Sequence, residues 1–132
     1  MKKLIFLIAI LASIVCLHSF RHISTGDPWV VPDKYLKMKN PVASDAASLK
    51  AGKVLFEKHC QSCHGKTGKG DGTKAATLDT EPGDFTSKTF KAEVDGAIFY
   101  KTQTGRKDMP TFKTKIPDEE DIWNLVNYMK SL

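Results

Sequence analysis

Cysteine is scarce in this sequence: three residues of 132 carry a thiol. Cys60 and Cys63 form a Cys-x-x-Cys pair, while Cys16 lies apart from them in an apolar run near the start. A four-ligand zinc site needs a second Cys or His pair at ligand spacing, and Cys16 does not supply one. A redox-active dithiol of the thioredoxin type needs a βαβ context, which the sequence does not indicate.

The sequence also lacks an apolar run of the length that usually crosses a bilayer. Its longest run, over residues 4–17, contains only apolar residues and Ser13 and follows Lys2 and Lys3. A membrane-spanning helix needs about 20 residues, whereas a short apolar run after basic residues is typical of a secretory signal. We therefore expect residues 1–20 to be a signal peptide or, because no small-x-small cleavage triplet follows directly, an N-terminal membrane anchor.

The residues after this run carry few further signals. Val15 precedes Cys16 where a lipoprotein site has a small residue, so we expect Cys16 to be an ordinary apolar part of the signal. His18 and His22 are four residues apart, but a metal role is not expected there. Residues 21–45 are rich in turn formers and predict an extended arm, whose apolar side chains should lie along the surface of a domain over residues 46–132.

The two paired cysteines belong to a short motif, Cys60-Gln61-Ser62-Cys63-His64. Cysteines at i and i+3 lie on one face of a helical turn, so both thiols can form thioethers with the two vinyl groups of one haem. His64 follows directly, and its imidazole can bind the iron as the proximal ligand. The motif therefore predicts one covalent haem c, against the alternatives of a dithiol, half a zinc site or a chance match.

The sequence has little excess charge. Its formal net charge of +5 becomes about +1 once Lys2 and Lys3 are removed and two haem propionates are added. Nucleic-acid binding is therefore not expected. Acidic residues cluster at 118–121, and basic residues lie near the segments assigned to the haem: Lys66, Lys69, Arg106, Lys107, Lys113 and Lys115. Such a distribution can orient a partner before contact.

A glycine-rich stretch over residues 65–72 follows the motif and contains Gly-Lys-Thr. A phosphate-binding loop needs a glycine five positions before Gly65, where Cys60 stands. We expect a tight loop around a haem edge instead, because glycine permits positive φ and close backbone approach.

Apolar periodicity predicts three helices in the domain. The first runs from residue 44 or 46 to residue 63, the second from 93 to 104 with Gly105 as its stop, and the third from 118 to 132. Gly52 interrupts the apolar stripe of the first helix, which suggests that the third helix comes close there. The third helix has its apolar face at Ile122, Leu125, Val126, Met129 and Leu132. Residues 73–91 should be irregular, with Phe85 and Phe90 available to cover porphyrin.

A methionine thioether suits haem iron as a second ligand. Met129 falls on an apolar stripe and should belong to the core, and Met38 lies in the arm. Met109 lies in a loop over residues 106–117, next to Pro110, which restricts its backbone. Met109 is therefore the predicted sixth ligand.

Together these residues resemble the small class I cytochromes c, over residues 46–132. The resemblance rests on Gly52-x-x-x-Phe56-x-x-x-Cys60-x-x-Cys63-His64, Gly68-Lys69-Gly70-Asp71-Gly72, Gly105, Met109-Pro110, and Trp123 with Leu125-x-x-Tyr128. It implies an all-α fold of a few helices wrapped round one covalent haem, in which the first and last helices cross. The family commonly has a proline soon after the haem histidine whose carbonyl orients the imidazole. Here the corresponding stretch is Gly72-Thr73-Lys74-Ala75-Ala76, so which carbonyl serves His64 stays open.

The leading functional interpretation is an exported monohaem electron carrier of a respiratory chain, because an iron with His and Met ligands has no open position for a substrate. We expect a monomer, not an enzyme, that exchanges electrons with redox proteins in the periplasm, either soluble or tethered to the outer face of the cytoplasmic membrane. One alternative is a haem c subunit or anchored domain of a membrane redox complex. Another is a peroxidase or gas-binding cytochrome, which would need distal acid-base groups; His59 is the nearest candidate and is expected to be exposed.

Overall fold

The structure is a computed structural model that describes residues 28–132. The expectations for the signal segment, Cys16, His18 and His22 lie outside these residues. The contacts divide the chain into two units, of which Val31–Leu132 contains every helix described here. No strand occurs in the described part of the chain, so the predicted all-α class is confirmed.

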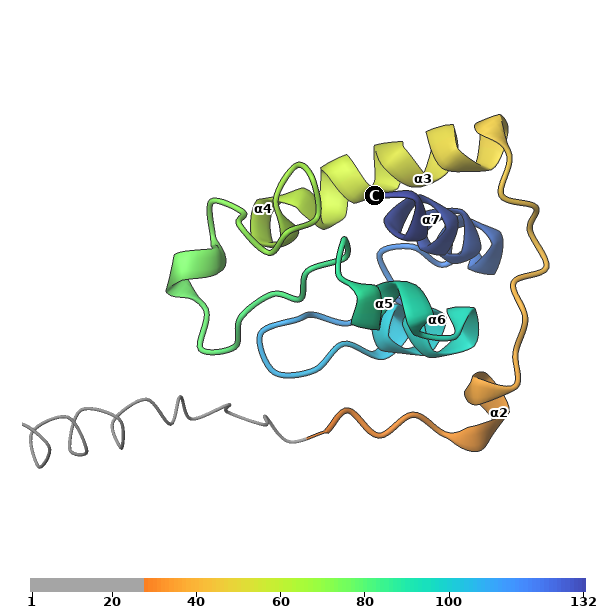
Figure 1. The fold of residues 1–132 in the computed structure, drawn as a ribbon, viewed down its shortest axis with the longest axis horizontal. Helices are drawn as coiled ribbons and strands as arrows, with labels where there is room; N and C mark the ends of the chain where they lie inside the picture. The colour runs from red at the N-terminus through yellow and green to blue at the C-terminus, as the bar shows by residue number, and fades with distance from the viewer. Residues whose placement is uncertain (1–27) are drawn as a thin grey trace, which may run out of the picture. The chain divides into compact units, whose positions relative to one another are not determined.

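The helices differ in length. The three long ones are α3 (Ala46–His59), α6 (Asp95–Thr104) and α7 (Glu119–Ser131); the short ones are α2 (Asp33–Leu36), α4 (Gln61–His64), α5 (Lys88–Ala92) and the 3-10 turn η1 (Ala75–Thr77). In Figure 1, α7 lies between α3 and the pair formed by α5 and α6. The core therefore lies around α7, the most strongly amphipathic element.

Helix α3 begins as predicted and ends earlier. Asp45 is its N-cap, and the carboxylate accepts a hydrogen bond of 2.9 Å from the backbone N–H of Ser48. The predicted continuation to Cys63 is interrupted at Cys60, where φ is −114°, well away from the helical value of about −63°. The α-helix is thus broken at Cys60, and α4 starts directly after it.

Helices α3 and α7 cross at Gly52. A Cβ placed on Gly52 would lie 2.1 Å from the backbone oxygen of Asn124 and 2.7 Å from Cβ of Tyr128. The rings of Phe56 and Tyr128 have centroids 5.3 Å apart, and Leu125 is fully buried. The predicted crossing of the first and last helices is thus confirmed, and no side chain larger than hydrogen fits at its centre.

The predicted boundaries of α6 and α7 agree with the structure to within two residues. Helix α6 ends at Gly105, whose φ of 64° is in the region that favours glycine. Asp118 caps α7 by accepting a 2.9 Å hydrogen bond from the N–H of Glu120. The Phe99 ring of α6 stacks on Trp123 of α7 with centroids 4.1 Å apart. This stacking joins the two helices on the side of α7 that faces away from α3.

The segment predicted as an extended arm packs into the domain and contains one helical turn, α2. The ring of Tyr35 stands 4.7 Å from that of Tyr100. The backbone oxygen of Tyr35 would lie 2.0 Å from a Cβ on Gly96, so α2 approaches the start of α6 closely. In this segment Tyr35, Met38 and Val42 pack against the hydrophobic core.

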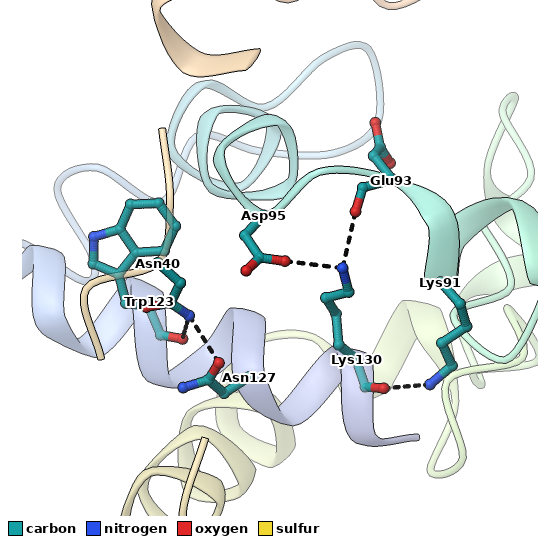
Figure 2. A network of polar contacts seen from close by, with 7 residues as sticks. All are labelled: Asn40, Lys91, Glu93, Asp95, Trp123, Asn127 and Lys130. Atoms are coloured by element: carbon teal, nitrogen blue, oxygen red, sulfur yellow. Dashed lines mark hydrogen bonds and ion pairs between the residues drawn. The ribbon is translucent and has the colours of Figure 1, made fainter. Parts of the chain in front are cut away.

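Two polar clusters tie distant parts of the chain to α7 (Figure 2). Asn40 donates from Nδ2 to Oδ1 of Asn127 at 2.8 Å and to the backbone oxygen of Trp123 at 3.3 Å. Lys130 donates to the backbone oxygen of Glu93 and to Oδ1 of Asp95, both at 2.9 Å. The contacts of Asn40 attach the arm to α7, and those of Lys130 attach the segment between α5 and α6 to α7.

Candidate haem site

The predicted attachment motif forms one compact turn after α3. The backbone oxygen of Cys60 accepts hydrogen bonds from the N–H of Cys63 at 3.1 Å and of His64 at 2.9 Å. Both thiols are free; that of Cys60 is buried and that of Cys63 is half-buried. Burial, assisted by the neighbouring Cys63, raises the pKa of Cys60 to about 12. The turn thus presents two unpaired thiols that are three positions apart.

The glycine-rich loop folds back over this turn. The N–H of Gly70 donates to the oxygen of His64 at 2.9 Å, and that of Gly72 donates to the oxygen of Cys63 at 3.1 Å. Gly65 and Gly70 both have φ of 79°, as the prediction of a tight glycine loop requires. A Cβ on Gly72 would lie 2.4 Å from the oxygen of Ser62. Through these hydrogen bonds the loop holds the backbone of Cys63 and His64 in place.

The imidazole of His64 is oriented by a backbone carbonyl. Its Nδ1 lies 3.4 Å from the oxygen of Gly83, which follows Pro82. Burial lowers the pKa of His64, and the contact with Gly83 acts in the opposite direction. A neutral imidazole whose Nδ1–H donates to a carbonyl keeps Nε2 free for a metal. The carbonyl that can orient His64 is therefore that of Gly83, and not one from residues 72–76.

Aromatic rings line the other side of this histidine. The ring of Phe85 stacks on the His64 imidazole with centroids 4.4 Å apart, and the Phe90 ring stands 4.5 Å from Phe85. Phe85 also contacts Phe56 of α3, with centroids 6.2 Å apart. These rings connect His64 to the hydrophobic core and give it an apolar environment.

Met109 ends a four-residue turn in the loop after α6. The N–H of Arg106 donates to the oxygen of Met109 at 2.8 Å, and the N–H of Met109 donates to the oxygen of Arg106 at 3.0 Å. Lys107, inside the turn, has a positive φ of 53°. The side chain of Met109 is half-buried and packs against the hydrophobic core. Both Met109 and, through Phe85, His64 therefore border the same core.

The other methionine candidates occupy different places. Met129 is 4% exposed and belongs to the core, as predicted. Met38 is half-buried in the arm, where its Cβ would lie 2.8 Å from a Cβ on Gly96. Packing against α6 therefore accounts for Met38.

Comparison with known proteins identifies the chain. A family model described as cytochrome C oxidase, cbb3-type, subunit III matches residues 47–129. The chain belongs to this family of c-type cytochrome domains. A search of curated protein sequences finds no match.

The fold of this cytochrome is also found in solved structures. A chain of the reducing HAO-like protein complex Kustc0457/Kustc0458 of Kuenenia stuttgartiensis matches with a TM-score of 0.64 and 25% sequence identity. The match covers 86% of this chain and 52% of the other, so the cytochrome spans about half the length of that relative. The predicted class I cytochrome c fold is confirmed.

The prediction of a covalent haem c is confirmed, because the domain of this family binds covalent haem c. The residues present fit the group, because two free thiols and a neutral, carbonyl-oriented imidazole lie in one turn. Cys60 and Cys63 would hold the porphyrin, and His64 would bind its iron. The cytochrome is therefore a monohaem electron-transfer protein in the general sense of its family.

Sequence reasoning missed two features of the site and misplaced one residue. The roles of Gly83 and of Asp108, which accepts from the N–H of Thr80, were not foreseen. The turn signal Pro82-Gly83-Asp84 marked where such a carbonyl could lie. His59, expected to be exposed, is half-buried, and its ring stands 6.0 Å from Phe112.

Among residues 28–132 no helix is long and apolar enough to cross a membrane.

Proposed function

We propose that the protein is an exported carrier of single electrons whose haem iron is bound by His64 and Met109. The observation that carries the proposal is the placement of Met109, half-buried against the core at the end of a short hydrogen-bonded turn. A side chain presented in this way can fill the sixth position in the resting protein. An iron with two protein ligands exchanges electrons and leaves no site for a substrate.

When bound, the haem supplies a ferric–ferrous couple, and Met ligation raises its reduction potential. The chain's own residues set the conditions for this couple. Gly83 keeps the imidazole of His64 in one orientation, and Phe85 covers it with an apolar ring. The thioether of Met109 is a weak donor that favours the ferrous state.

Charge supports exchange with acidic redox proteins. The basic residues in the haem-ligating segments include several that are exposed: Lys66, Lys69, Lys107, Lys113 and Lys115. The acidic cluster lies at the start of α7, where Asp118 and Glu119 are exposed. Separated charges of this kind orient a partner before contact. We place the monomeric protein in the periplasm, soluble or held at the outer face of the cytoplasmic membrane.

A second candidate is a haem c subunit of a membrane redox complex. The observation that favours it is the family itself, whose description is that of an oxidase subunit. The ligand chemistry would be the same, and the partner would be a permanent neighbour.

Carbon monoxide binding tests the ligand assignment. Reduced wild type should bind carbon monoxide slowly or not at all, whereas Met109→Ala should bind it rapidly and stoichiometrically, as followed by haem absorbance. Met38→Ala is the control, because it removes a half-buried methionine that packs against α6. If wild type and Met109→Ala bind equally fast, the carrier proposal is wrong and a gas-binding or peroxidase function takes its place.

Fractionation tests the location and separates the two candidates. The native protein is recovered from periplasm and from membranes, and its intact mass is measured. A haem-loaded chain shortened near residue 20 in the periplasm supports the soluble carrier. A full-length chain that co-purifies with an integral oxidase in mild detergent supports the subunit.

A further inference from the structure

The turn that carries Met109 is joined to a distant loop by one side chain. Oδ2 of Asp108 accepts a hydrogen bond of 2.8 Å from the backbone N–H of Thr80. The two residues are 28 positions apart in sequence, and both are exposed. Thr80 lies between η1 and α5, in the segment that also supplies Gly83 to His64. The bond thus links the segment beside one candidate ligand to the turn that carries the other.

The turn itself is strained. Lys107 adopts a φ of 53°, which side chains with a Cβ rarely adopt. Residues in such conformations persist when the surrounding structure holds them, and they gather at sites of function. The two backbone hydrogen bonds between Arg106 and Met109 close the turn, but they do not attach it to the rest of the fold. Met109 packs against the hydrophobic core, and Asp108, next to both Lys107 and Met109, adds a hydrogen bond to the Thr80 segment.

We propose that Asp108 is a positioning residue that holds the Met109 turn against the Thr80 segment and so limits how often the sixth iron position opens. The inference rests on the proposed ligation of iron by Met109. Asp108 touches neither iron nor substrate, and it acts through the backbone of its neighbour. Because the bond is exposed and single, water can replace it, and the opening is a local event that leaves the crossing of α3 and α7 intact.

Four variants of the haem-loaded full chain separate this role from other effects. Asp108→Ala removes the acceptor, whereas Asp108→Asn keeps an oxygen that can accept from Thr80 and removes only the charge. Asp79→Ala is the matched control, since Asp79 is an exposed carboxylate beside Thr80. Met109→Ala gives the rate of a permanently open site.

The measurements are the rate of carbon monoxide binding to reduced protein and the exchange rate of the Thr80 amide hydrogen. Asp108→Ala should speed both by roughly three- to tenfold, as expected for the loss of one exposed hydrogen bond. Asp108→Asn should stay within about twofold of wild type, and Asp79→Ala should match wild type. The unfolding midpoint of Asp108→Ala by far-ultraviolet circular dichroism should fall only slightly below that of Asp79→Ala, as the loss of one exposed hydrogen bond gives, so that global unfolding stays too rare to account for the faster rates.

The outcomes distinguish this inference from the proposed function. If Asp108→Ala binds carbon monoxide as slowly as wild type while Met109→Ala binds fast, the positioning role is wrong and the ligation stands. The positioning role is also wrong if the Asp108→Ala rate rises only in proportion to global unfolding. If wild type already binds as fast as Met109→Ala, the ligation is wrong, and the inference fails with it. Should Asp108→Ala fail to fold, Thr80→Pro removes the same bond from the donor side, and the rate of carbon monoxide binding decides.

Discussion

Gly72 and Gly83 both lie at the haem site, but a side chain would meet different surroundings at each. A Cβ on Gly72 would lie 2.4 Å from the oxygen of Ser62 and 2.5 Å from the carbonyl of Cys63, whereas a Cβ on Gly83 meets nothing within 4 Å. Gly83 acts on His64 through its backbone oxygen, which an alanine also has.

We therefore expect Gly72→Ala to displace the attachment turn and Gly83→Ala to be tolerated. Gly72→Ala should lower the yield of covalently loaded protein and reduce its stability by about 1–3 kcal/mol, as overpacking does. Haem content per chain, from absorbance and intact mass, measures the first effect, and a urea melt measures the second. Equal loading of the two variants would contradict the close approach at Gly72.

His59 offers a pH-dependent prediction. Burial against Phe112, together with the positive charges of Lys58 and Lys115, lowers the pKa of His59 from 6.5. The folded state therefore binds fewer protons than the unfolded state below pH 6.5, and the contribution of His59 to stability falls as the pH falls through that value.

Nuclear magnetic resonance titration of the reduced protein should give a pKa for His59 below 6.5. Lys58→Gln and Lys115→Gln should each raise it, because each removes a nearby positive charge. Phe112→Ala should raise it further, because water then reaches the ring. A pKa that all three substitutions leave unchanged would mean that neither burial nor charge sets it.

The two halves of the haem site differ in how far the sequence could predict them. Cys60, Cys63 and His64 lie within five consecutive residues, so one local turn determines both their chemistry and their relative positions. Gly83 lies 19 residues from His64, in irregular backbone, and it acts through an atom that every residue has. The identity of a residue carries little information about which backbone carbonyl will point at an imidazole.

At the scale of elements, the crossing of α3 and α7 leaves no space for a side chain at Gly52. The Asn124 oxygen that a Gly52 side chain would meet belongs to the backbone of α7, so the two helices must separate to admit it. Gly52→Val should lower the free energy of unfolding by about 3 kcal/mol, the upper end of typical overpacking costs.

Chemical denaturation of the haem-loaded protein measures this loss. Val54→Ala on the same helix is the control, because Val54 is 58% exposed and such surface changes stay within about 0.5 kcal/mol. A Gly52→Val protein that unfolds at the wild-type midpoint would show that the helices do not cross at this position.

The long helices were predictable and the short ones were not. Helix α7 has its acidic first turn, its cap at Asp118 and its apolar face within its own sequence. Helices α2 and α5 span four and five residues, too few for a periodic pattern, and tertiary packing decides their conformation. The end of α3 was misjudged for a related reason: the apolar stripe continues through Cys60, but the regular helical geometry is broken there.

At the scale of the whole molecule, the compact unit begins at Val31, well before the haem domain suggested by the resemblance. The buried side chain of Asn127, which is 8% exposed, joins the residues after Val31 to this unit. Its amide donates to the oxygens of Val42 at 3.2 Å and Ala43 at 3.3 Å, and its own oxygen accepts from Asn40. Without residues 31–43 this buried amide would lose most of its partners.

Two truncated chains behind one export signal test the contribution of the arm. A chain that starts at Val31 should unfold like the parent. A chain that starts at Ser44 keeps the Asp45 cap of α3 and should lose about 3 kcal/mol or more, because buried polar groups without partners cost about 1–3 kcal/mol each. Equal unfolding midpoints would mean that the arm is dispensable.

The burial of Cys60 constrains the order of events when the protein is made. A thiol reacts as its thiolate, and a pKa of about 12 leaves almost none at neutral pH once the chain is folded. In a chain that has not yet folded, residues 60–64 are accessible, because Glu119–Ser131, the helix that completes the crossing with α3, is not yet in place. Both thiols can react in that state, so we expect the thioether bonds to form before folding is complete. Haem attachment and the folding of the last helix therefore compete in time when this protein matures.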